Sequence, residues 1–539
     1  MKLKKKQEML KKLEKTLWSS AEKLRGSVDP SRYKDIVLGI IFLKYASDMF
    51  EERRKELIDL SKNPESDYYC ETEDELIELL EDKEEYISEN VFYIPEHSRW
   101  DYLIKNAKNP NIAKLLDDAM VLLEKQNSKL KGVLPKEYVR AEIPHEKLGA
   151  LLDLFNNINY KEFIENKDES IGDVFGTIYG YFMRNFSQKL GQKGGEFFTP
   201  ECIVKLLVEL VEPLRGRIYD PACGSGGMFV QSSKFVKEYI KNGNGVDLAI
   251  YGQELNSSNV RICKMNLAIH RLPHDQIKQG DTLSDDKHRD LKADYIITNP
   301  PFNYKDYDPK VLEGDVRFPY GIVPKKAENA KSGNANFLWI QHFIYHLSDD
   351  GIAAFIMANG SLSAGGKEGE IRKKIIEEGI VDCIISLPNK MFYTTQIPAC
   401  IWVIDKNKEN GRFRSRKWET LFIDAREIYT QVSRNQNEFS EEQIKKIADV
   451  YRSYRGEEGY PEYKDEKGFC KVATIEEIRE QDYVLSPGRY VGIADVEEDS
   501  EPFEEKMERL TKELSEHFKK SKELEEKIKN NLNELGFKI

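Results

Sequence analysis

The sequence predicts an α/β protein with a doubly wound sheet, a helical domain before it and a helical tail after it. Three observations support this fold class. Short apolar runs alternate with amphipathic stretches between residues 166 and 430, as expected of strand and helix units. Residues 1–165 show apolar residues at helical spacing, without the alternation typical of strands. The end of the chain has a heptad-like apolar stripe.

The apolar runs of the middle region are the predicted strands. The first run, residues 217–220, is followed by a glycine-rich turn and a predicted helix from about residue 229 to residue 240. The run at 294–298 has the composition of a buried parallel strand. Further strands are predicted at residues 249–253, 276–279, 352–357, 382–387 and 400–404.

The chain of 539 residues is long enough for about three or four domains. Its 40% hydrophobic content is sufficient to build their cores. We expect a helical N-terminal domain at 1–165, the sheet domain at 166–430, a mixed extension at 431–497 and an amphipathic helical tail at 498–539.

Composition and charge limit the classes of function. The net charge of −12 has the wrong sign for a protein that covers DNA unaided, so DNA binding would need a local basic patch or a partner. The seven cysteines form no C-x-x-C pair or cluster, which argues against a disulfide framework and a zinc site. The apolar run at 39–43 is too short to span a bilayer, and no export signal follows the basic start. A cytoplasmic protein without membrane association is expected.

A glycine-rich turn follows the first predicted strand. Its sequence is Asp220-Pro221-Ala222-Cys223-Gly224-Ser225-Gly226-Gly227-Met228. Glycines let the backbone approach a ligand closely, and the start of the next helix favours negative groups. The turn has neither the G-x-G-x-x-G spacing of a dinucleotide site nor the G-x-x-x-x-G-K-[ST] pattern of a triphosphate site. A smaller cofactor fits it better.

Polar residues also end the second and third predicted strands. Glu254 follows the second strand, where a carboxylate accepts hydrogen bonds from a ribose diol in nucleotide-binding folds. Asp281 and Thr282 follow the third strand. The alternative for each acid is a helix N-cap or a solvated loop residue, but polar residues at three successive strand ends favour a binding site.

Asn299-Pro300-Pro301-Phe302 lies at the carboxyl end of the strand at 294–298. In an open α/β sheet, ligands bind at this edge. The Asn299 amide accepts from or donates to a planar amine, the prolines fix the backbone and leave the Pro300 carbonyl free, and Phe302 offers a stacking face. The tetrapeptide therefore suits an exocyclic amine on a flat ring. A plain strand-ending turn is the alternative.

In this order, the motifs resemble those of the amino-group DNA methyltransferases, and within them the modification subunit of type I restriction-modification systems. The segment Gly195-Glu196-Phe197-Phe198-Thr199-Pro200 precedes the sheet, and the glycine turn, Glu254, Asp281 and the tetrapeptide follow. Residues 17–18, 24–28 and 38–50 resemble the helical domain of this subunit, and Asp482-Tyr483-Val484-Leu485-Ser486-Pro487-Gly488-Arg489-Tyr490 resembles its tail region. The resemblance covers nearly the whole chain.

The resemblance implies an adenine-specific DNA methyltransferase with a Rossmann-like methyltransferase sheet. Its cofactor would be S-adenosylmethionine, with the ribose on Glu254, the adenine near Asp281 and Thr282, and the methionine end between the glycine turn and residues 196–200. The implied cofactor-binding residues are Glu196, Phe197, Phe198, Thr199, Pro200, Asp220, Pro221, Ala222, Gly224, Ser225, Gly226, Gly227, Glu254, Asp281 and Thr282. The implied catalytic residues are Asn299, Pro300, Pro301 and Phe302. The implied partners are double-stranded DNA, a specificity subunit that reads the sequence, a second copy of this subunit and a restriction subunit.

The expected chemistry needs neither a nucleophilic side chain nor a metal. The Asn299 oxygen and the Pro300 carbonyl would hold both N6 hydrogens of adenine and direct the nitrogen lone pair towards the methyl group. Such positioning contributes about 7 to 11 kcal/mol. The base must leave the duplex and stack, here on Phe302. The chain has no Pro-Cys dipeptide, which disfavours methylation at cytosine C5, and Asn rather than Ser at position 299 resembles adenine enzymes more than cytosine N4 enzymes.

Two other functions stay open on the sequence alone. Protein-glutamine and RNA methyltransferases use the same Asn-Pro-Pro-aromatic motif, although residues 197–200 and the helical N-terminal domain disfavour them. A non-enzymatic scaffold of a defence complex is the second alternative, and the intact motifs disfavour it.

Three further features have two interpretations each. Residues 303–334 form an unusually long connection, expected to be a substrate loop with residues 317–321 and 325–326 near DNA, or an ordered packing loop. His342 and His346 lie four apart on a predicted helix, and without a third ligand we expect packing or surface residues rather than metal ligands. Phe392-Tyr393 either lines the target pocket or belongs to the core.

The tail carries an apolar stripe that needs a partner surface. It consists of Phe503, Met507, Leu510, Leu514, Leu524, Ile528 and Leu535. A single amphipathic helix cannot bury such a stripe, so it folds back on its own chain or joins another one. The resemblance and the acidic charge favour the helical spacers of a specificity subunit.

Overall fold

The computed structural model describes residues 2–26, 28–158, 171–190, 199–239, 247–324, 333–392, 397–493 and 503–534. The chain divides into two compact units, Met1–Val491 and Gly492–Ile539. None of the described helices has the length and the apolar composition needed to cross a bilayer.

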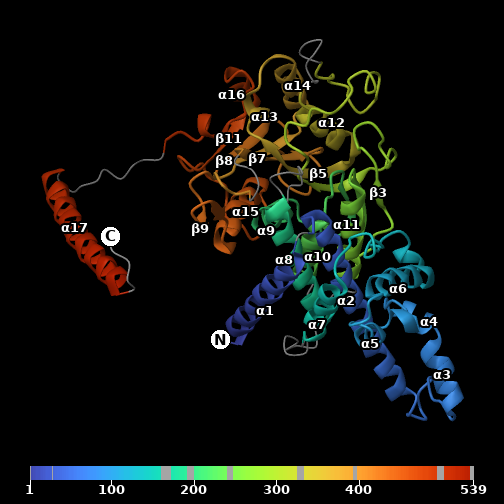
Figure 1. Cartoon of the computed structure of the whole chain (residues 1–539). Helices are drawn as coiled ribbons and strands as arrows, with labels where there is room; N and C mark the ends of the chain where they lie inside the picture. Colours follow the sequence, from blue (N-terminus) through green and yellow to red (C-terminus); the bar gives the residue numbers. More distant parts are fainter. Residues whose placement is uncertain are drawn as a thin grey trace. The chain divides into compact units, whose positions relative to one another are not determined.

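The first unit begins with a group of helices around one apolar core (Figure 1). Helix α2 (Pro30–Leu60) starts at a proline, and the Asp29 side chain caps it by accepting from the Ser31 backbone amide. Its middle is buried around the whole circumference, which explains the continuous apolar run in the sequence. The other elements are α1 (Lys2–Arg25), α3 (Glu73–Glu81), α4 (Glu84–Ile87), η1 (Glu96–Ser98), α5 (Trp100–Lys105), α6 (Ile112–Gln126), η2 (Ser128–Leu130), α7 (His145–Asn156) and α8 (Ile171–Leu190).

The centre of this unit is a nine-stranded sheet in the order β11-β8-β6-β7-β5-β4-β1-β2-β3. The strands are β1 (Gly216–Asp220), β2 (Leu248–Glu254), β3 (Ile277–Gln279), β4 (Ala293–Thr298), β5 (Leu347–Ala358), β6 (Val381–Ser386), β7 (Ala399–Asp405), β8 (Glu419–Asp424) and β11 (Cys470–Thr474). β1 pairs in parallel with both β2 and β4, so the strand order reverses at β1. β7 lies antiparallel between β5 and β6. The predicted doubly wound α/β fold is confirmed, and its switch point lies at β1 and β4.

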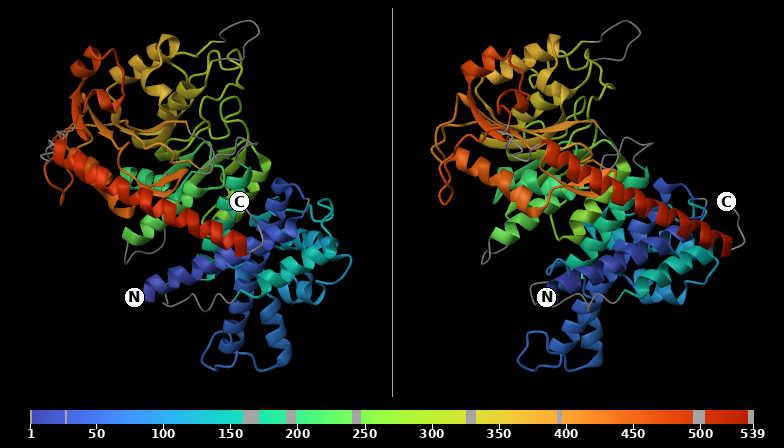
Figure 2. Two further views of the ribbon diagram at one scale, coloured as in Figure 1. Left: turned by 60° about the vertical axis from the view of Figure 1, so that its left-hand side comes forward. Right: turned by 90° about the vertical axis from the view of Figure 1, so that its left-hand side faces the viewer.

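Helices cover both faces of the sheet, as Figure 1 and the two views of Figure 2 show. Successive strand residues face opposite cores. Ile218 of β1 belongs to the core that contains residues of α9, α10 and α15, whereas Tyr219 belongs to the core that contains residues of α12, α14 and α16. The helices that follow the N-terminal group in this unit are α9 (Glu201–Val211), α10 (Gly227–Tyr239), α11 (Ser257–Ile269), α12 (Asn336–His346), α13 (Gly360–Ser363), α14 (Gly366–Glu377), α15 (Glu441–Arg455) and α16 (Ile475–Glu480). Four residues of α11 also belong to the core of the N-terminal helices, so that domain and the sheet share buried contacts.

The extension predicted at 431–497 contributes to the same sheet and core. β11 pairs antiparallel with β8, and α15 brings Tyr451 to Asp382 of β6, with the hydroxyl donating to the carboxylate at 2.6 Å. Arg416 and Lys408 also lie within ion-pair distance of that buried carboxylate, at 3.3 and 3.5 Å. A short hairpin, β9 (Thr430–Ser433) and β10 (Gln436–Glu438), precedes α15, and η4 (Pro487–Arg489) lies near the end of the unit.

The second unit contains one long helix, α17 (Phe503–Glu534). Its large apolar side chains are exposed: Met507, Leu510, Leu514, Phe518, Leu524 and Ile528. Five of these belong to the predicted stripe, while the side chains of Phe503 and Leu535 lie outside the described residues.

Candidate functional site

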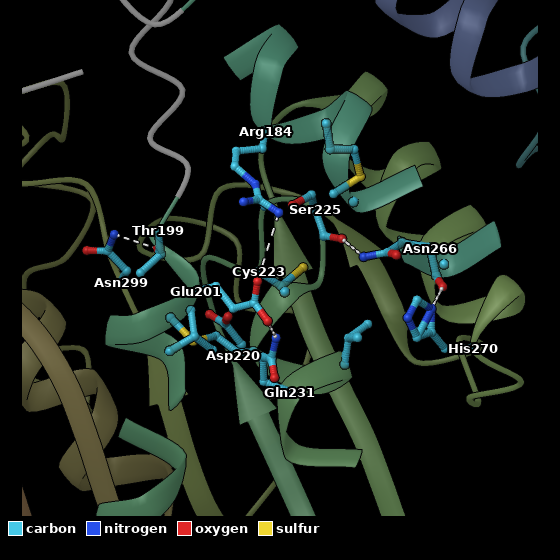
Figure 3. Close-up of a pocket in the computed structure, with 18 of the residues that line it drawn as sticks. Arg184, Thr199, Glu201, Asp220, Cys223, Ser225, Gln231, Asn266, His270 and Asn299 are labelled. Carbon is cyan, nitrogen blue, oxygen red and sulfur yellow. Dashed lines mark hydrogen bonds and ion pairs between the residues drawn. The ribbon is translucent and has the colours of Figure 1, made fainter. Parts of the chain in front are cut away.

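A cavity of about 180 Å³ lies at the carboxyl ends of β1 and β4, where the strand order reverses (Figure 3). It brings together the glycine turn, Asn299 and Thr199 with side chains from α8, α9, α10 and α11. The lining residues are Gly176, Thr177, Gly180, Met183, Arg184, Thr199, Glu201, Val204, Asp220, Ala222, Cys223, Gly224, Ser225, Gly227, Met228, Val230, Gln231, Lys234, Asn266, His270 and Asn299.

Asp220 anchors the start of the glycine turn. Its Oδ1 accepts from the Ala222 backbone amide at 3.0 Å and from the Thr298 hydroxyl at 2.6 Å. The carboxyl is fully buried, and this desolvation raises its pKa from 3.8 to about 7, although both hydrogen bonds act in the opposite direction. A cation bound beside this carboxyl would favour its charged form.

The glycines of the turn have two different roles. Gly226 has φ +81°, and a Cβ there would lie 2.9 Å from the Cys263 sulfur, so the backbone must pass close to α11. Gly224 and Gly227 line the cavity, and a Cβ at either position would meet no atom within 4 Å. The backbone is therefore exposed to the cavity where a ligand would approach it.

Two side chains hold the turn in place. Asn266 of α11 donates to the Ser225 carbonyl at 2.9 Å. Glu254 at the end of β2 accepts from the Gly224 amide at 3.0 Å and, with its other oxygen, from the Asn256 amide at 2.8 Å. The Glu254 carboxylate thus lies beside the turn, although it does not line the cavity itself.

Asp281 and Thr282 lie next to the turn but outside the cavity lining. The Thr282 hydroxyl donates to the Pro221 carbonyl at 2.6 Å and is buried. Asp281 accepts from the Leu283 amide at 3.1 Å and from the Ser284 hydroxyl at 2.8 Å. Their side chains therefore stabilise the local structure around Pro221.

The Asn299 amide has one partnered and one unpartnered end. Its Nδ2 donates to the Thr199 hydroxyl at 2.8 Å (Figure 3). Its Oδ1 is buried, and no described residue forms a hydrogen bond with it. An unpaired buried acceptor costs about 1–3 kcal/mol, and its presence beside a cavity marks the place where a donor would bind.

Phe302 is half-buried and packs edge-on against Phe392, with ring centroids 5.8 Å apart. Pro300 is buried, and among the described residues none donates a hydrogen bond to its carbonyl. In the sequence, Pro300 and Pro301 therefore separate Asn299, whose amide oxygen is unpaired, from Phe302, which packs on Phe392. Tyr393 and residues 394–395 lie outside the described residues.

The sequence motifs did not predict that α8 forms one side of the cavity. Gly176, Gly180 and Arg184 of this helix line the cavity. A Cβ at Gly176 would lie 2.4 Å from the His270 ring, so the glycine lets α8 approach α11. Gly176, Gly180 and Arg184 are four residues apart in the sequence, and this spacing could have predicted that they share one helix face.

Several predicted site residues lie outside the described residues, namely Glu196, Phe197, Phe198 and the pair at 325–326. The suggestion that Arg317 contacts DNA is wrong. Its side chain is buried, pairs with Asp315 at 2.7 Å and donates to the carbonyls of Thr282 and Leu283. A DNA phosphate cannot reach it, because the loop is packed around its guanidinium.

His342 and His346 are buried, and the structure brings a third possible ligand, Asp286, next to them, which the sequence did not indicate. With Asp286 they place three possible ligand atoms within 4.8 Å of one another. However, Arg317 donates to His342 Nδ1 at 3.1 Å and lies 3.6 Å from Asp286, while His346 Nε2 contacts Asp286 at 2.9 Å. These contacts already use the possible ligand atoms, and a guanidinium next to them opposes a second cation. We refer to Asp286, Arg317, His342 and His346 as the histidine cluster.

A second hollow, of about 460 Å³, lies at the same edge of the sheet beyond β5. β5 and β6 both run antiparallel to β7, and β6 is parallel to β8, so their carboxyl ends share the edge with Asn299. The hollow is lined by Asn359, Gly360, Leu362, Ser363, Ser386, Arg426, Ser486, Gly488 and Arg489. Arg426 pairs with Asp424 at 2.6 Å, whereas no described acid pairs with the exposed Arg489.

Comparisons with known proteins identify the family of the chain. A family model described as N-6 DNA Methylase matches residues 170–499, and one described as HsdM N-terminal domain matches residues 13–155. The chain is 41% identical over 536 residues to the type I restriction enzyme MjaIX methylase subunit of Methanocaldococcus jannaschii, covering 98% of this chain and 92% of that protein. It is 44% identical over 435 residues to the HindI methylase subunit of Haemophilus influenzae, covering 80% of this chain and 94% of that protein.

A solved structure shows the same fold. The type I restriction-modification system methyltransferase subunit from Streptococcus thermophilus superposes with a TM-score of 0.73 at 25% identity, covering 90% of this chain and 100% of that chain. The resemblance stated from the motifs is confirmed: the chain belongs to the N-6 DNA methylase family, among the methylase subunits of type I restriction enzymes.

Proposed function

We propose that the protein transfers a methyl group from S-adenosylmethionine to the N6 amine of an adenine flipped out of DNA, as the modification subunit of a type I restriction-modification complex. The observation that carries this proposal is the buried, unpartnered Asn299 oxygen at the carboxyl end of β4, beside the glycine turn. The family supports the same reaction.

The residues around the cavity fit this cofactor. S-adenosylmethionine, when bound, supplies a methyl group on a positively charged sulfur. Gly224 and Gly227 present open backbone to the cavity, and Asp220 offers a buried acid to a cationic ligand. Thr199 and Pro200 would line the methionine end together with residues 196–198, and the Glu254 carboxylate, which lies beside the turn, would accept from ribose hydroxyls.

Asp281 and Thr282 would lie near the adenine ring of the cofactor. The Thr282 hydroxyl is committed to Pro221, so it would act by holding the pocket wall rather than by bonding the ring. Asp281 has intermediate exposure and retains further lone pairs on its carboxylate.

The target amine would meet two acceptors. Asn299 Oδ1 and the Pro300 carbonyl each accept one N6 hydrogen, which fixes the plane of the amine and turns the nitrogen lone pair towards the methyl group. Both acceptors lack a partner among the described residues. Positioning of this kind accelerates direct transfer without a covalent intermediate.

The flipped base would stack on Phe302, and Phe392 holds that ring from the side. A base stacked on an aromatic side chain contributes roughly 1 to 3 kcal/mol. This stabilisation offsets part of the free energy needed to unstack the base from the duplex.

DNA would run along the carboxyl edge of the sheet, from Asn299 towards the hollow at the ends of β5, β6 and β8. Arg426 and Arg489 provide local positive charge there, although the whole chain carries −12. The logarithm of DNA affinity falls linearly with the logarithm of salt concentration. Each phosphate-binding side chain that is removed makes this line less steep by about 0.9. We expect Arg489→Ala to lower that slope in the assembled complex, whereas an unchanged slope would place the DNA elsewhere.

The implied partners follow from the relatives, which are methylase subunits of type I restriction enzymes. We propose that a specificity subunit reads the DNA sequence and that its helical spacers cover the exposed stripe of α17. A second copy of this chain and a restriction subunit would complete the assembly.

Truncation tests the role of the tail. A chain ending at Asp499 should bind S-adenosylmethionine like the full chain but fail to co-purify with the specificity subunit encoded beside it. If the truncated chain still assembles and methylates the same sites, α17 is not the coupling element.

Transfer of a radiolabelled methyl group tests the reaction itself. The purified chain, with and without its co-expressed specificity subunit, is incubated with DNA, RNA and protein. Incorporation into DNA by the complex supports the proposal. Labelling of RNA or of glutamine side chains would support the alternative methyltransferases, and failure of calorimetry to detect cofactor binding would support a scaffold.

A further inference from the structure

We propose that Thr199 is a positioning residue for the reaction: its hydroxyl holds the Asn299 amide in place by accepting from the amide nitrogen, so that the amide oxygen remains for the substrate. This inference rests on the proposed function and assigns Thr199 a role separate from cofactor binding.

The contact itself is specific. Asn299 Nδ2 donates to Thr199 Oγ1 at 2.8 Å, and the opposite end of the same amide, Oδ1, is buried and unpartnered beside the cavity. Both residues line the cavity, and Figure 3 shows the amide of Asn299 turned with its nitrogen to Thr199. The contact therefore occupies the nitrogen end of the amide and leaves the oxygen end unpartnered.

The position of the hydroxyl is fixed by its neighbours. Thr199 directly precedes Pro200, whose carbonyl accepts from the amides of Ile203 and Val204 at 3.0 and 3.1 Å. These bonds form the first turn of α9, and α9 is anchored by buried apolar side chains in the core beneath the sheet. Asn299 is fixed from the other side by β4 and by Pro300. The two side chains are thus held by separate elements.

The orientation matters because the two ends of an amide have the same shape and opposite hydrogen-bonding character. The amine of adenine offers two hydrogens to its partners. With Oδ1 towards the cavity the amide accepts one of them, whereas after a flip two N–H groups would face two N–H groups. In the observed orientation the Thr199 hydroxyl accepts from Nδ2, which leaves Oδ1 as the unpartnered end. A hydroxyl can also donate to the oxygen of a flipped amide, so the contact holds the amide in place, and the hydrogens of the substrate amine select the end that faces them.

The contact also links two motifs that are 100 residues apart in the sequence. Thr199 belongs to the segment implied in binding the methionine end of the cofactor, and Asn299 belongs to the segment implied in binding the target base. One hydrogen bond therefore joins the two halves of the site.

Kinetics of the complex with its specificity subunit test the proposal. Thr199→Val keeps the branched shape and removes the acceptor, and we expect kcat to fall about ten- to a hundredfold, because misplacement of a reacting group has effects of that order. Because Thr199 also belongs to the segment assigned to the methionine end of the cofactor, kcat is measured at saturating S-adenosylmethionine, and the dissociation constant from calorimetry should rise by a smaller factor than kcat falls. Thr199→Ser keeps the hydroxyl and should restore most of kcat.

A matched control uses the same substitution elsewhere. Thr430 lies on the exposed strand β9, where its hydroxyl contacts Gln443 at 3.4 Å. Thr430→Val should leave kcat and cofactor affinity unchanged. Retained cofactor binding shows in each case that the variant is folded.

The orientation of the amide has its own readout. Hypoxanthine carries a carbonyl oxygen where adenine carries its amine, so a flipped Asn299 would donate to it. Binding is compared between duplexes with adenine or hypoxanthine at the methylated position. Thr199→Val should reduce the preference for adenine relative to wild type, and Thr199→Ser should retain it.

Three results would overturn the inference. These are a wild-type kcat in Thr199→Val, a loss of cofactor affinity that matches the loss of kcat, or an unchanged preference for adenine over hypoxanthine. Failure of the proposed function looks different, because the wild-type complex would then transfer no methyl group to DNA.

Discussion

Two groups of buried polar side chains lie close to β1, and they differ in how completely their hydrogen bonds are satisfied. In the histidine cluster, Arg317 contacts Asp286 and His342, and His346 contacts Asp286. At the carboxyl edge, Asn299 Oδ1 has no described partner and the pKa of Asp220 is raised by burial. A satisfied network stabilises the fold, whereas an unpaired acceptor on a residue that lines a cavity is a candidate for a hydrogen bond from a ligand. The comparison thus separates a structural group from a functional one, although both contain residue types that ligate metals or catalyse reactions.

The largest effect should come from Asn299→Ala. Loss of the acceptor should lower methyl transfer more than about a hundredfold, because the target amine is no longer positioned. Cofactor affinity should stay within a few fold, since no cofactor contact is removed. Calorimetry and a methyl-transfer assay measure the two quantities. A parallel loss of S-adenosylmethionine binding would contradict the assignment of Asn299 to the amine.

Arg317→Ala should act on stability instead. It leaves the buried Asp286 carboxylate without its guanidinium, and breaking such a pair costs about 3–5 kcal/mol. Urea denaturation measures the change, with the exposed Arg289→Ala as a matched control. If the variant loses less than about 1 kcal/mol of stability, the cluster is not a tightly coupled network.

Glu254→Ala should weaken cofactor binding about ten- to a hundredfold, because a charged acceptor is removed and the Gly224 amide loses its partner. Gly226→Val should act in the same direction through its strained φ of +81° and the contact with Cys263. The exposed Glu313→Ala serves as a control. Calorimetric affinities equal to wild type in both site variants would move the cofactor site away from this turn.

The smallest effect concerns pH and has opposite signs in the two groups. The folded pKa of Asp220 is raised from 3.8 to about 7, so its contribution to stability falls as the pH rises from about 4 to 7. The pKa of Asp286 is lowered. Desolvation by burial, the largest influence, raises this pKa, but the contacts with His346, His288 and Arg317 together outweigh it. The contribution of Asp286 to stability is therefore lost as the pH falls below the pKa of the carboxyl in the unfolded chain.

Asp220→Asn should therefore stabilise the unliganded protein at pH 8 and flatten the pH dependence of stability between 4 and 7. Thermal unfolding over this range measures both. A steeper fall in the variant would show that Asp220 is ionised in the folded protein at low pH.

The sequence predicted the parts of the fold that depend on local pattern. All seven strands inferred from apolar runs are present, and Asp220, Ala222, Gly224, Ser225, Gly227 and Asn299 do meet at one cavity. Strand ends and turn glycines are legible because composition at neighbouring positions determines them. The antiparallel direction of β7 and the addition of β11 to the sheet depend on pairing between distant segments, which no local pattern specifies.

The same limit applies to the site. Arg184 and the glycines of α8 reach the cavity only because that helix packs on α11, and Asn266 reaches Ser225 from another helix. Arg317 looked suited to DNA by its residue type, but burial against Asp315 and two carbonyls decides its role. The contact between Thr199 and Asn299 likewise depends on the fold rather than on either motif.

The central claim is that the unpaired Asn299 oxygen receives the amine of adenine, and the product identifies that amine directly. DNA is incubated with the complex and S-adenosylmethionine carrying a deuterated methyl group, digested to nucleosides and analysed by mass spectrometry. The account predicts label in N6-methyladenine and none in that nucleoside with Asn299→Ala. Label in N4-methylcytosine or 5-methylcytosine, or undiminished N6-methyladenine with the variant, would contradict it.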